Sequence, residues 1–181
     1  NNGILGKRNE MPRRTSCTSQ TASLKFDNVD RCFTELIQGE NMNAVLTTEY
    51  GPITFKFYPE DAPKTVERIT ALIAEGFYDG LTFHRVIPGF VAQGGDPKGN
   101  GTGGTGVKIK AEFNKQKHLN GTLAMARSSD PNSADCQFYI CLGAQPHLDN
   151  QYTVFGQVTE GLDLINKIKV GDSIISFTLK E

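Results

Sequence analysis

The feature that most constrains the fold is a series of short apolar runs, each bounded by glycine or proline, that extends from residue 43 to residue 180. In the best-defined run Ile53, Phe55 and Phe57 alternate with other residues, which places one set of side chains on one face of a strand. The runs are the segments 43–58 (two strands around a turn), 83–87, 105–113, 121–127, 136–143, 152–158 and 173–180. No strand–helix–strand alternation connects them, so the pattern favours an antiparallel sheet.

Only two segments have helical periodicity, and they lie far apart in the chain. The first, 61–78, opens with Asp61 and Pro63 and ends at Gly76. Its apolar stripe consists of Val66, Ile69, Leu72 and Ile73. The second, 159–170, is expected to bury Leu162, Ile165 and Ile168. Many short strands with two separated helices indicate a mainly β fold, an antiparallel barrel or sandwich capped by helices.

The composition fits one globular domain preceded by an extension. Hydrophobic residues make up 38% of the 181 residues, and no apolar run is long enough for a membrane span. The net charge of −1 gives no general attraction to nucleic acid or to a membrane surface, so neither is an expected partner. Residues 1–43 are polar and aperiodic, and we expect a flexible extension there, with Met42 as a candidate internal start and residues 44–181 as the domain.

The glycine-rich segment 101–106 spells G-x-G-x-x-G, the fingerprint of dinucleotide-binding loops. That fingerprint requires a helix directly after the loop, whereas residues 107–110 alternate apolar and basic residues as a strand does. We therefore expect a surface loop in which glycine allows positive φ angles and close backbone approach.

Residue types suited to metal or nucleophilic chemistry are scattered. His84, His118 and His147 have no ligand spacing, and no C-x-x-C or G-x-S-x-G motif occurs, so no metal site is expected. Cys136 and Cys141 are an odd number of positions apart in one expected strand and hence lie on opposite faces. We expect them to be buried, reduced thiols, as in a cytoplasmic protein.

The segment 83–96 stands out because one arginine lies among apolar and amide-bearing residues. Phe83, Arg85 and Ile87 point to the same side of the expected strand, which Pro88 ends. Taken alone, such an arginine is more typical of a structural ion pair or of a side chain that lies along the surface than of a functional group.

Four sequence blocks in order resemble the cyclophilin family of peptidyl-prolyl cis-trans isomerases: FHRVIPGFVAQGGD, NGTGGTG, GTLAMARSSDPNSADCQFYI and LDNQYTVFGQV. The similarity covers about residues 44–181. It implies a mainly β fold, a closed eight-stranded antiparallel β-barrel capped by two α-helices, with a packed interior and a groove on its outer surface. It also implies an isomerase that needs no cofactor and assists protein folding.

The same resemblance assigns the residues of the site. The family's catalytic arginine corresponds to Arg85, and the amide that holds the substrate backbone corresponds to Gln93. The pocket for the proline ring corresponds to Phe90, Val91, Tyr139 and Leu148. The remaining groove residues that it implies are His84, Gly101, Ala126, Arg127, Gln137, His147 and Tyr152. The loop at 101–104 borders a neighbouring pocket for residues that precede the proline.

Several of these positions differ from what eukaryotic relatives commonly carry, and the pattern is similar to the bacterial branch. His147 stands where those relatives have Trp, and Tyr152 where they have His. Arg127 and Val91 replace Asn and Met. The absence of the indole donor implies that cyclosporin binds, but more weakly. Tyr139 replaces a usual Phe, so the pocket floor gains a hydroxyl.

Two functions are open at this point. An active isomerase would act on proline-containing peptides and unfolded proteins as a cytoplasmic monomer. A non-catalytic module would instead bind proline-containing segments within a larger assembly. The presence of Arg85, Phe90 and Gln93 together favours the isomerase, since a protein that only binds has no need of the charge.

Overall fold

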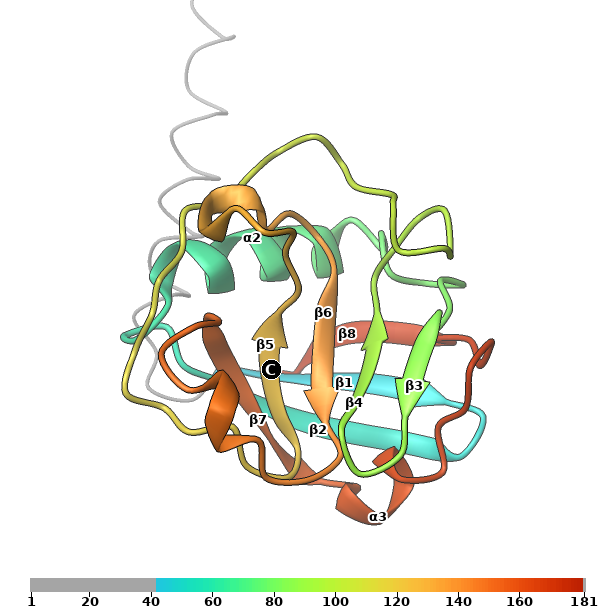
Figure 1. Cartoon of the computed structure of the whole chain (residues 1–181). Helices are drawn as coiled ribbons and strands as arrows, with labels where there is room; N and C mark the ends of the chain where they lie inside the picture. Colours follow the sequence, from blue (N-terminus) through green and yellow to red (C-terminus); the bar gives the residue numbers. More distant parts are fainter. Residues whose placement is uncertain (1–41, 181) are drawn as a thin grey trace, which may run out of the picture. The chain divides into compact units, whose positions relative to one another are not determined.

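Eight antiparallel strands form one sheet in the computed structural model, which describes residues 42–180 (Figure 1). The strands are β1 (Asn43–Thr48), β2 (Gly51–Phe57), β3 (Arg85–Ile87), β4 (Val91–Gly94), β5 (Thr122–Met125), β6 (Phe138–Cys141), β7 (Val154–Glu160) and β8 (Ser176–Lys180). Their order along the sheet is β3-β4-β6-β5-β7-β2-β1-β8. The expected mainly β architecture is confirmed. The extension expected over residues 1–43 lies almost wholly outside the described residues.

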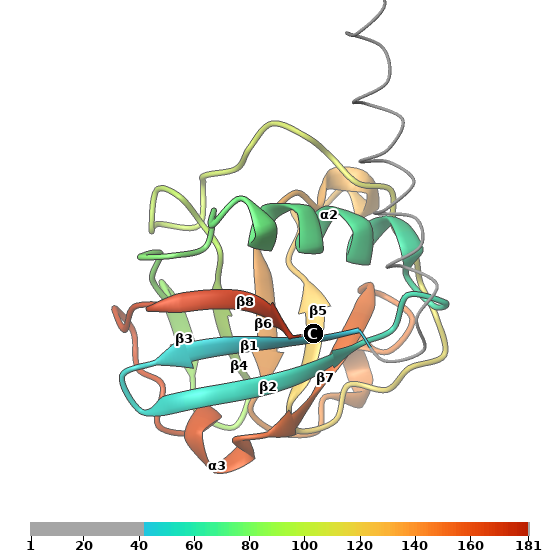
Figure 2. The ribbon, with the colours of Figure 1, turned by 180° about the vertical axis from the view of Figure 1, so that it is seen from behind.

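The sheet curls until β1, β2 and β8 lie behind the other strands (Figures 1 and 2), but its two edge strands do not pair as a ladder. Instead the residues just before β3 and β8 meet: Thr82 forms an isolated bridge with Ser173, and the Phe83 N–H donates to the Asp172 carbonyl at 2.9 Å. The expectation of a closed barrel is therefore too strong. β3 has only three residues before the turn at Pro88, which leaves too little strand to complete a ladder.

The two helices lie at opposite ends of the curled sheet in both views (Figures 1 and 2). They are α2 (Pro63–Ala74) and α3 (Leu162–Ile165), and two 3₁₀ turns, η1 (Pro131–Ser133) and η2 (Pro146–Leu148), lie in loops. α2 buries the predicted apolar stripe and ends before Gly76, which has a φ of +68°. Among residues 42–180, no helix has the length and apolar character needed to cross a bilayer.

Two expected elements differ from the structure. The helix predicted over 159–170 is confined to α3, because β7 continues to Glu160 and Gly161 turns the chain with a φ of +88°. Ile165 and Ile168 are buried as expected, whereas Leu162 is 39% exposed.

The strand predicted over 105–113 does not form. The β pairing of this segment within residues 42–180 is limited to one isolated bridge between Ile109 and Ala134. A side chain replaces a ladder partner next to it, since the Ala111 N–H donates to Asn132 Oδ1 at 3.0 Å. No helix follows the glycines either, so the dinucleotide fingerprint lacks its required context.

Apolar side chains lie on both faces of the sheet and form two clusters. Along β6, Phe138 and Ile140 belong to the inner cluster, while Tyr139 and Cys141 belong to the outer one. The outer-face cluster consists of Val91, Ala124, Tyr139, Cys141 and Val154, with Tyr58, Phe90, Ala126, Leu148 and Tyr152 packed against it. Cys136 lies in the inner cluster, so Cys136 and Cys141 are free and buried in different clusters, as expected. The groove lies on the outer face.

Candidate active site

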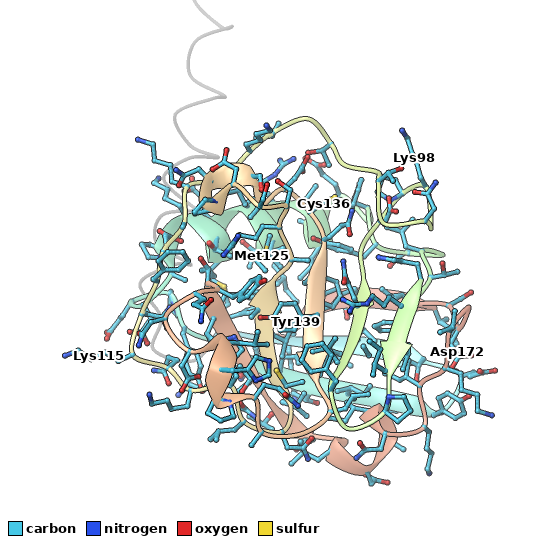
Figure 3. All side chains as sticks on the ribbon, in the orientation of Figure 1. Lys98, Lys115, Met125, Cys136, Tyr139 and Asp172 are labelled. Atoms are coloured by element: carbon cyan, nitrogen blue, oxygen red, sulfur yellow. The ribbon has the colours of Figure 1, made fainter. Side chains whose placement is uncertain are left out.

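Three neighbouring strands bring a guanidinium, an amide and an aromatic ring into one row on the outer face. Arg85 in β3 pairs with Gln93 in β4, and Gln93 pairs with Tyr139 in β6. Because directly paired residues of antiparallel strands project to the same face, their side chains stand side by side. Tyr139 lies near the centre of this half of the sheet (Figure 3).

A small hollow of about 110 Å³ adjoins this row. Its lining combines aromatic and aliphatic side chains with two guanidinium groups and one amide. The lining residues are Arg85, Phe90, Val91, Gln93, Ala126, Arg127, Tyr139, Leu148 and Tyr152. The resemblance assigned all nine to the groove. An apolar hollow with a few polar groups suits one small apolar ring whose orientation is fixed by hydrogen bonds.

The aromatic walls of the hollow are packed against other rings. Tyr152 meets Tyr139 edge-on, with ring centroids 5.9 Å apart and an interplanar angle of 82°. Phe90 stacks on His147 with a centroid distance of 5.9 Å and an angle of 13°. His147 is exposed and is not one of the lining residues, so it extends the wall outward from Phe90.

Arg127 is fixed in place by hydrogen bonds. Its Nη1 donates to the carbonyl oxygens of Ser128 at 2.9 Å and Ser129 at 3.3 Å, and its Nη2 donates to that of Gln151 at 3.0 Å. Its guanidinium carbon lies 4.5 Å from the centre of the Tyr152 ring, within cation–π range. Arg127 therefore braces the wall of the hollow.

Arg85 is held far more loosely. Its side chain is exposed, and its guanidinium carbon lies 6.0 Å from the centre of the Phe90 ring. Within residues 42–180 the Arg85 guanidinium makes no hydrogen bond or ion pair. Its five N–H donors therefore remain available to a ligand in the hollow.

Gln93 connects this hollow to a second one. Its Nε2 donates to Gln137 Oε1 at 3.0 Å, and Gln137 Nε2 donates to the carbonyl oxygens of Gly103 at 2.8 Å and Gly101 at 3.2 Å. The second hollow, of about 230 Å³, is lined by Gln93, Gly101, Gly103, Ala126, Arg127, Ser128, Ser133, Asp135 and Gln137. The two hollows share three lining residues, so one extended chain can occupy both.

The glycine-rich loop beside the second hollow is folded around the carboxylate of Asp96, which is 1% exposed. This carboxylate accepts backbone N–H groups from Lys98 at 2.9 Å, from Asn100 at 2.9 Å and from Gly101. Burial acts to raise the pKa of Asp96, but these donors outweigh it and the pKa is lowered. A Cβ on Gly103 would lie 1.9 Å from Asp96 Oδ1, so glycine is required there.

Asp135 holds the other end of the loop. Its Oδ2 accepts the backbone N–H groups of Thr105 and Gly106, each at 2.8 Å. A Cβ on Gly104 would lie 2.7 Å from the same oxygen. The glycines therefore allow the backbone to wrap closely around two carboxylates, which is the role expected for them here.

Behind the floor of the first hollow lies a chain of buried polar groups. The Tyr139 hydroxyl is 3.1 Å from His118 Nε2, and His118 Nδ1 is 3.0 Å from Asp149 Oδ1. The hydrogen bond from the His118 backbone N–H is the main cause that lowers the pKa of Asp149 to about 2. Burial lowers the pKa of His118 although Asp149 acts to raise it. The hydroxyl expected in the pocket floor is thus bonded to His118.

His84 does not line either hollow. It precedes strand β3, and a Cβ on Gly101 would lie 3.6 Å from its Nε2. Its Nδ1 is buried and has no hydrogen-bond partner among the described residues. Burial lowers its pKa, although Asp96 acts to raise it.

Four polar residues that shape the site were not predicted to belong to it: Asp96, His118, Asp135 and Asp149. Asp96 does begin the stretch D-P-K-G-N-G, a composition typical of turns in which an aspartate accepts nearby N–H groups. His118 and Asp149 are 31 positions apart, and no local pattern connects them.

The site does not rely on a thiol. Burial raises the pKa of Cys136 and of Cys141 to about 12, so both stay protonated at neutral pH. Among the residues that the structure describes, no group of three or more His, Cys, Asp or Glu side chains is placed to hold a metal ion. The first hollow presents two guanidinium groups and an amide beside apolar side chains.

These features define a class of site: a groove of two adjoining hollows on the outside of a curled antiparallel sheet. Residues 43–176 match the family described as "Cyclophilin type peptidyl-prolyl cis-trans isomerase/CLD". The chain belongs to this family and is a cyclophilin-type peptidyl-prolyl cis-trans isomerase.

Bacterial relatives have closely similar sequences. A peptidyl-prolyl cis-trans isomerase of Synechococcus elongatus is 51% identical over 135 residues, which is 74% of this chain and 92% of the relative. Peptidyl-prolyl cis-trans isomerase B of Bacillus subtilis is 52% identical over 122 residues, 66% of this chain and 85% of the relative. The resemblance to the bacterial branch is consistent with these matches.

A solved structure has the same fold. The cyclophilin-type isomerase of Cryptosporidium parvum has a TM-score of 0.73 at 29% identity, covering 78% of this chain and 98% of that one. A second crystal structure of that protein was obtained in the presence of the dipeptide Ala-Pro, with a TM-score of 0.71 at 29% identity over 77% of this chain and 99% of that one.

Proposed function

We propose that Arg85 accelerates rotation about X-Pro bonds by stabilising the twisted amide while the first hollow holds the proline ring. The substrates are proline-containing segments of peptides and unfolded proteins, whose folding the protein assists. The observation that carries this proposal is the row of Arg85, Gln93 and Tyr139 beside a hollow suited to one small ring.

The chemistry follows from the bond itself. Resonance holds the amide planar, with a rotation barrier of ~18–20 kcal/mol. The cis and trans forms of an X-Pro bond differ by only about 0.5–1 kcal/mol, so a catalyst needs no energy input and only has to lower the barrier. As the amide twists, resonance is lost and the lone pair becomes localised on the proline nitrogen, which turns pyramidal and basic. A guanidinium near that nitrogen stabilises the twisted form more than the planar one.

The residues around Arg85 hold the two sides of the rotating bond. Phe90, Val91 and Tyr139 enclose the ring, which immobilises one side of the rotating bond. One N–H of Gln93 is used by Gln137, which leaves its carbonyl oxygen and second N–H for the substrate backbone. With both sides of the bond held, rotation is concentrated on the X-Pro amide.

We assign the catalytic unit to residues 44–181. Within residues 42–180, those that line either hollow lie between Arg85 and Tyr152, and the family match begins at residue 43. We propose that residues 1–43 are an extension to this domain.

The test is substitution of Arg85 in the full chain. Arg85→Ala removes the charge from the reacting nitrogen, so we expect the cis–trans exchange rate of an Ala-Pro peptide, measured by NMR exchange spectroscopy, to fall by about 10²–10³. The dissociation constant of the same peptide, from a chemical-shift titration, should change only a few-fold. Arg85→Lys, which keeps the charge but loses the planar fork, should have intermediate activity. An exchange rate in Arg85→Ala equal to that of the wild type would refute the role of Arg85.

Assistance to folding is tested with a protein whose refolding is limited by a slow proline isomerisation. Such a step takes tens of seconds or longer at room temperature. We expect the wild type to accelerate this phase and Arg85→Ala not to do so. If neither accelerates it although both bind the Ala-Pro peptide, the protein acts instead as a proline-peptide-binding module.

A further inference from the structure

The floor of the first hollow is attached to a buried hydrogen-bonded chain that no step of the proposed mechanism uses. Tyr139 supplies the floor, and its hydroxyl lies 3.1 Å from Nε2 of His118. The two rings are also nearly parallel, with an angle of 17° and a centroid distance of 6.2 Å. The His118 side chain has no exposed surface, so it cannot touch a substrate.

Asp149 determines which atoms of this hydrogen-bonded chain donate and which accept. Its Oδ1 accepts both the backbone N–H of His118 at 2.9 Å and the ring Nδ1–H at 3.0 Å, and Lys117 Nζ lies 3.1 Å from its other oxygen. A carboxylate only accepts hydrogen bonds, so the proton of the neutral imidazole is on Nδ1. Nε2 is then an acceptor, and the Tyr139 hydroxyl must donate to it.

This chain of hydrogen bonds restrains the Tyr139 ring at a point that packing does not reach. The Tyr139 ring is held at its base by β6, at its hydroxyl by His118 and on its side by Tyr152. An apolar floor alone would fix the ring by packing only. The hydroxyl bond adds a directional restraint at the far end of the ring, which is the kind of support that fixes a binding surface before the ligand arrives.

We propose that His118, oriented by Asp149, is a positioning residue that holds the Tyr139 ring at the floor of the hollow and so sets how tightly the ring of the substrate is bound. This inference rests on the proposed assignment of the hollow to the proline ring. His118 acts on substrate binding through Tyr139 and takes no part in stabilising the twisted amide.

The decisive variant is His118→Leu, which removes the acceptor of the hydroxyl and leaves it buried without a partner. An unpaired buried hydroxyl favours any displacement of the ring that restores a hydrogen bond. We expect KM, and the dissociation constant of an Ala-Pro peptide, to rise by about fivefold or more, with kcat within about twofold of the wild type. His118→Gln, which keeps an acceptor near the hydroxyl, should recover part of the loss.

A second substitution distinguishes positioning from mere support of the fold. In the double variant His118→Leu/Tyr139→Phe the unpaired hydroxyl is gone, so KM should return most of the way to the value of Tyr139→Phe alone. The matched control is Tyr78→Phe, which deletes another buried hydroxyl, bonded to the Cys136 carbonyl at 2.9 Å in the inner cluster. It should lower the melting temperature and leave KM unchanged.

The outcomes separate the two proposals. If His118→Leu lowers only the melting temperature, or if the double variant does not recover KM, then His118 has a structural role and the inference is wrong. If Arg85→Ala also retains full activity, the hollow is not the reaction site and the proposed function has failed with it. Loss of activity in Arg85→Ala together with an unchanged KM in His118→Leu refutes the positioning role alone.

Discussion

At the scale of single residues, the two arginines of the groove show how surroundings decide the role of a side chain. Arg127 donates to three backbone carbonyls and covers the Tyr152 ring, so it belongs to the wall. The guanidinium of Arg85 lies near Phe90 and makes no hydrogen bond within the described residues. A guanidinium with unused donors can respond to charge that develops on a ligand, whereas one held by several carbonyls is less free to do so.

His147 gives a prediction at this scale. It stacks on Phe90 at the outer end of the wall, and its imidazole is smaller than an indole and lacks the indole N–H at the same reach. We expect the wild type to bind cyclosporin and His147→Trp to bind it roughly three- to tenfold more tightly, the gain of one hydrogen bond with added ring contact. Titration calorimetry measures the change. Equal affinities would show that this position does not control binding of the drug.

A groove residue could be predicted where a short sequence block that resembles the family contains it. Arg85, Phe90 and Gln93 lie within one block that resembles the family, so they were found together. His118 and Asp149 were not, because their importance comes from a contact between distant loops. The resemblance assigned His84 to the groove together with Arg85, but His84 precedes the strand and lines neither hollow.

At the scale of elements, helix α2 is capped by a residue from far along the chain. Its N-cap position is Ala62, whose side chain makes no capping hydrogen bond. Glu112 takes that role: its carboxylate accepts the backbone N–H groups of Lys64 at 3.0 Å and Thr65 at 2.9 Å, and the Thr65 hydroxyl at 2.7 Å. The extended segment that failed to become a strand thus secures the start of the helix.

Removal of this cap should lower the free energy of unfolding and leave the rate of peptide isomerisation unchanged. Glu112→Ala leaves two N–H groups of the first turn without their acceptor, so we expect a loss of about 1–2 kcal/mol in the free energy of unfolding, typical of a lost N-cap. Urea unfolding measures this loss, and the peptide exchange rate should be unchanged. Glu67→Ala, which removes only an exposed ion pair with Lys64, is the control and should cost much less. Equal losses in the two variants would contradict the capping role.

The elements that sequence periodicity predicted well are those whose pattern agrees with their surroundings. α2 has an apolar stripe and a terminating glycine, and the structure follows both. Residues 105–113 alternate as a strand does, but no neighbouring strand offers a free edge, so the backbone uses side-chain acceptors instead. Asp61 was predicted to mark the start of the helix. Its carboxylate instead accepts a hydrogen bond from Gln116 Nε2 at 2.7 Å, and the N-cap position of α2 is Ala62.

For the molecule as a whole, the titratable groups whose pKa values are lowered by folding predict how the free energy of unfolding depends on pH. The pKa of Asp149 is lowered to about 2, and the pKa of His118 is lowered by burial. In both cases the unfolded chain binds protons at a higher pH than the folded chain does. Stability must therefore fall as the solution is acidified, first as pH passes below the ordinary histidine value of about 6.5, then below about 3.9 for the aspartate.

We expect the urea midpoint to be constant above about pH 7, to decline below it and to fall further between about pH 5 and 2. Asp149→Asn removes the carboxylate that contributes to the acid limb, so its midpoint should be lower than that of the wild type at pH 7 and should decline less between pH 5 and 2. The same substitution at the exposed Asp163 is the control. A parallel decline in wild type and Asp149→Asn would rule out Asp149 as a source of the acid sensitivity.

The overall architecture was predictable because many short strands and two separated helices leave few arrangements open. Closure of the sheet was not, since it depends on whether the edge strands are long enough to meet. β3 spans three residues, and the seam is made by irregular backbone bonds such as that from Phe83 to Asp172. Strand length at an edge is set by turns and by tertiary contacts, which periodicity does not report.

The two hollows are built on different kinds of backbone. Arg85, Gln93 and Tyr139 of the first hollow lie in hydrogen-bonded strands, whereas Gly101, Gly103 and Ser128 of the second lie in loops. Loops tolerate substitution and insertion far better than sheet strands do. We therefore expect a combinatorial library at the exposed loop residues Pro97, Lys98 and Thr102, with the glycines kept, to change which peptides are preferred while the exchange rate is retained. The strands that carry Arg85 and Gln93 would stay unchanged in every member of such a library.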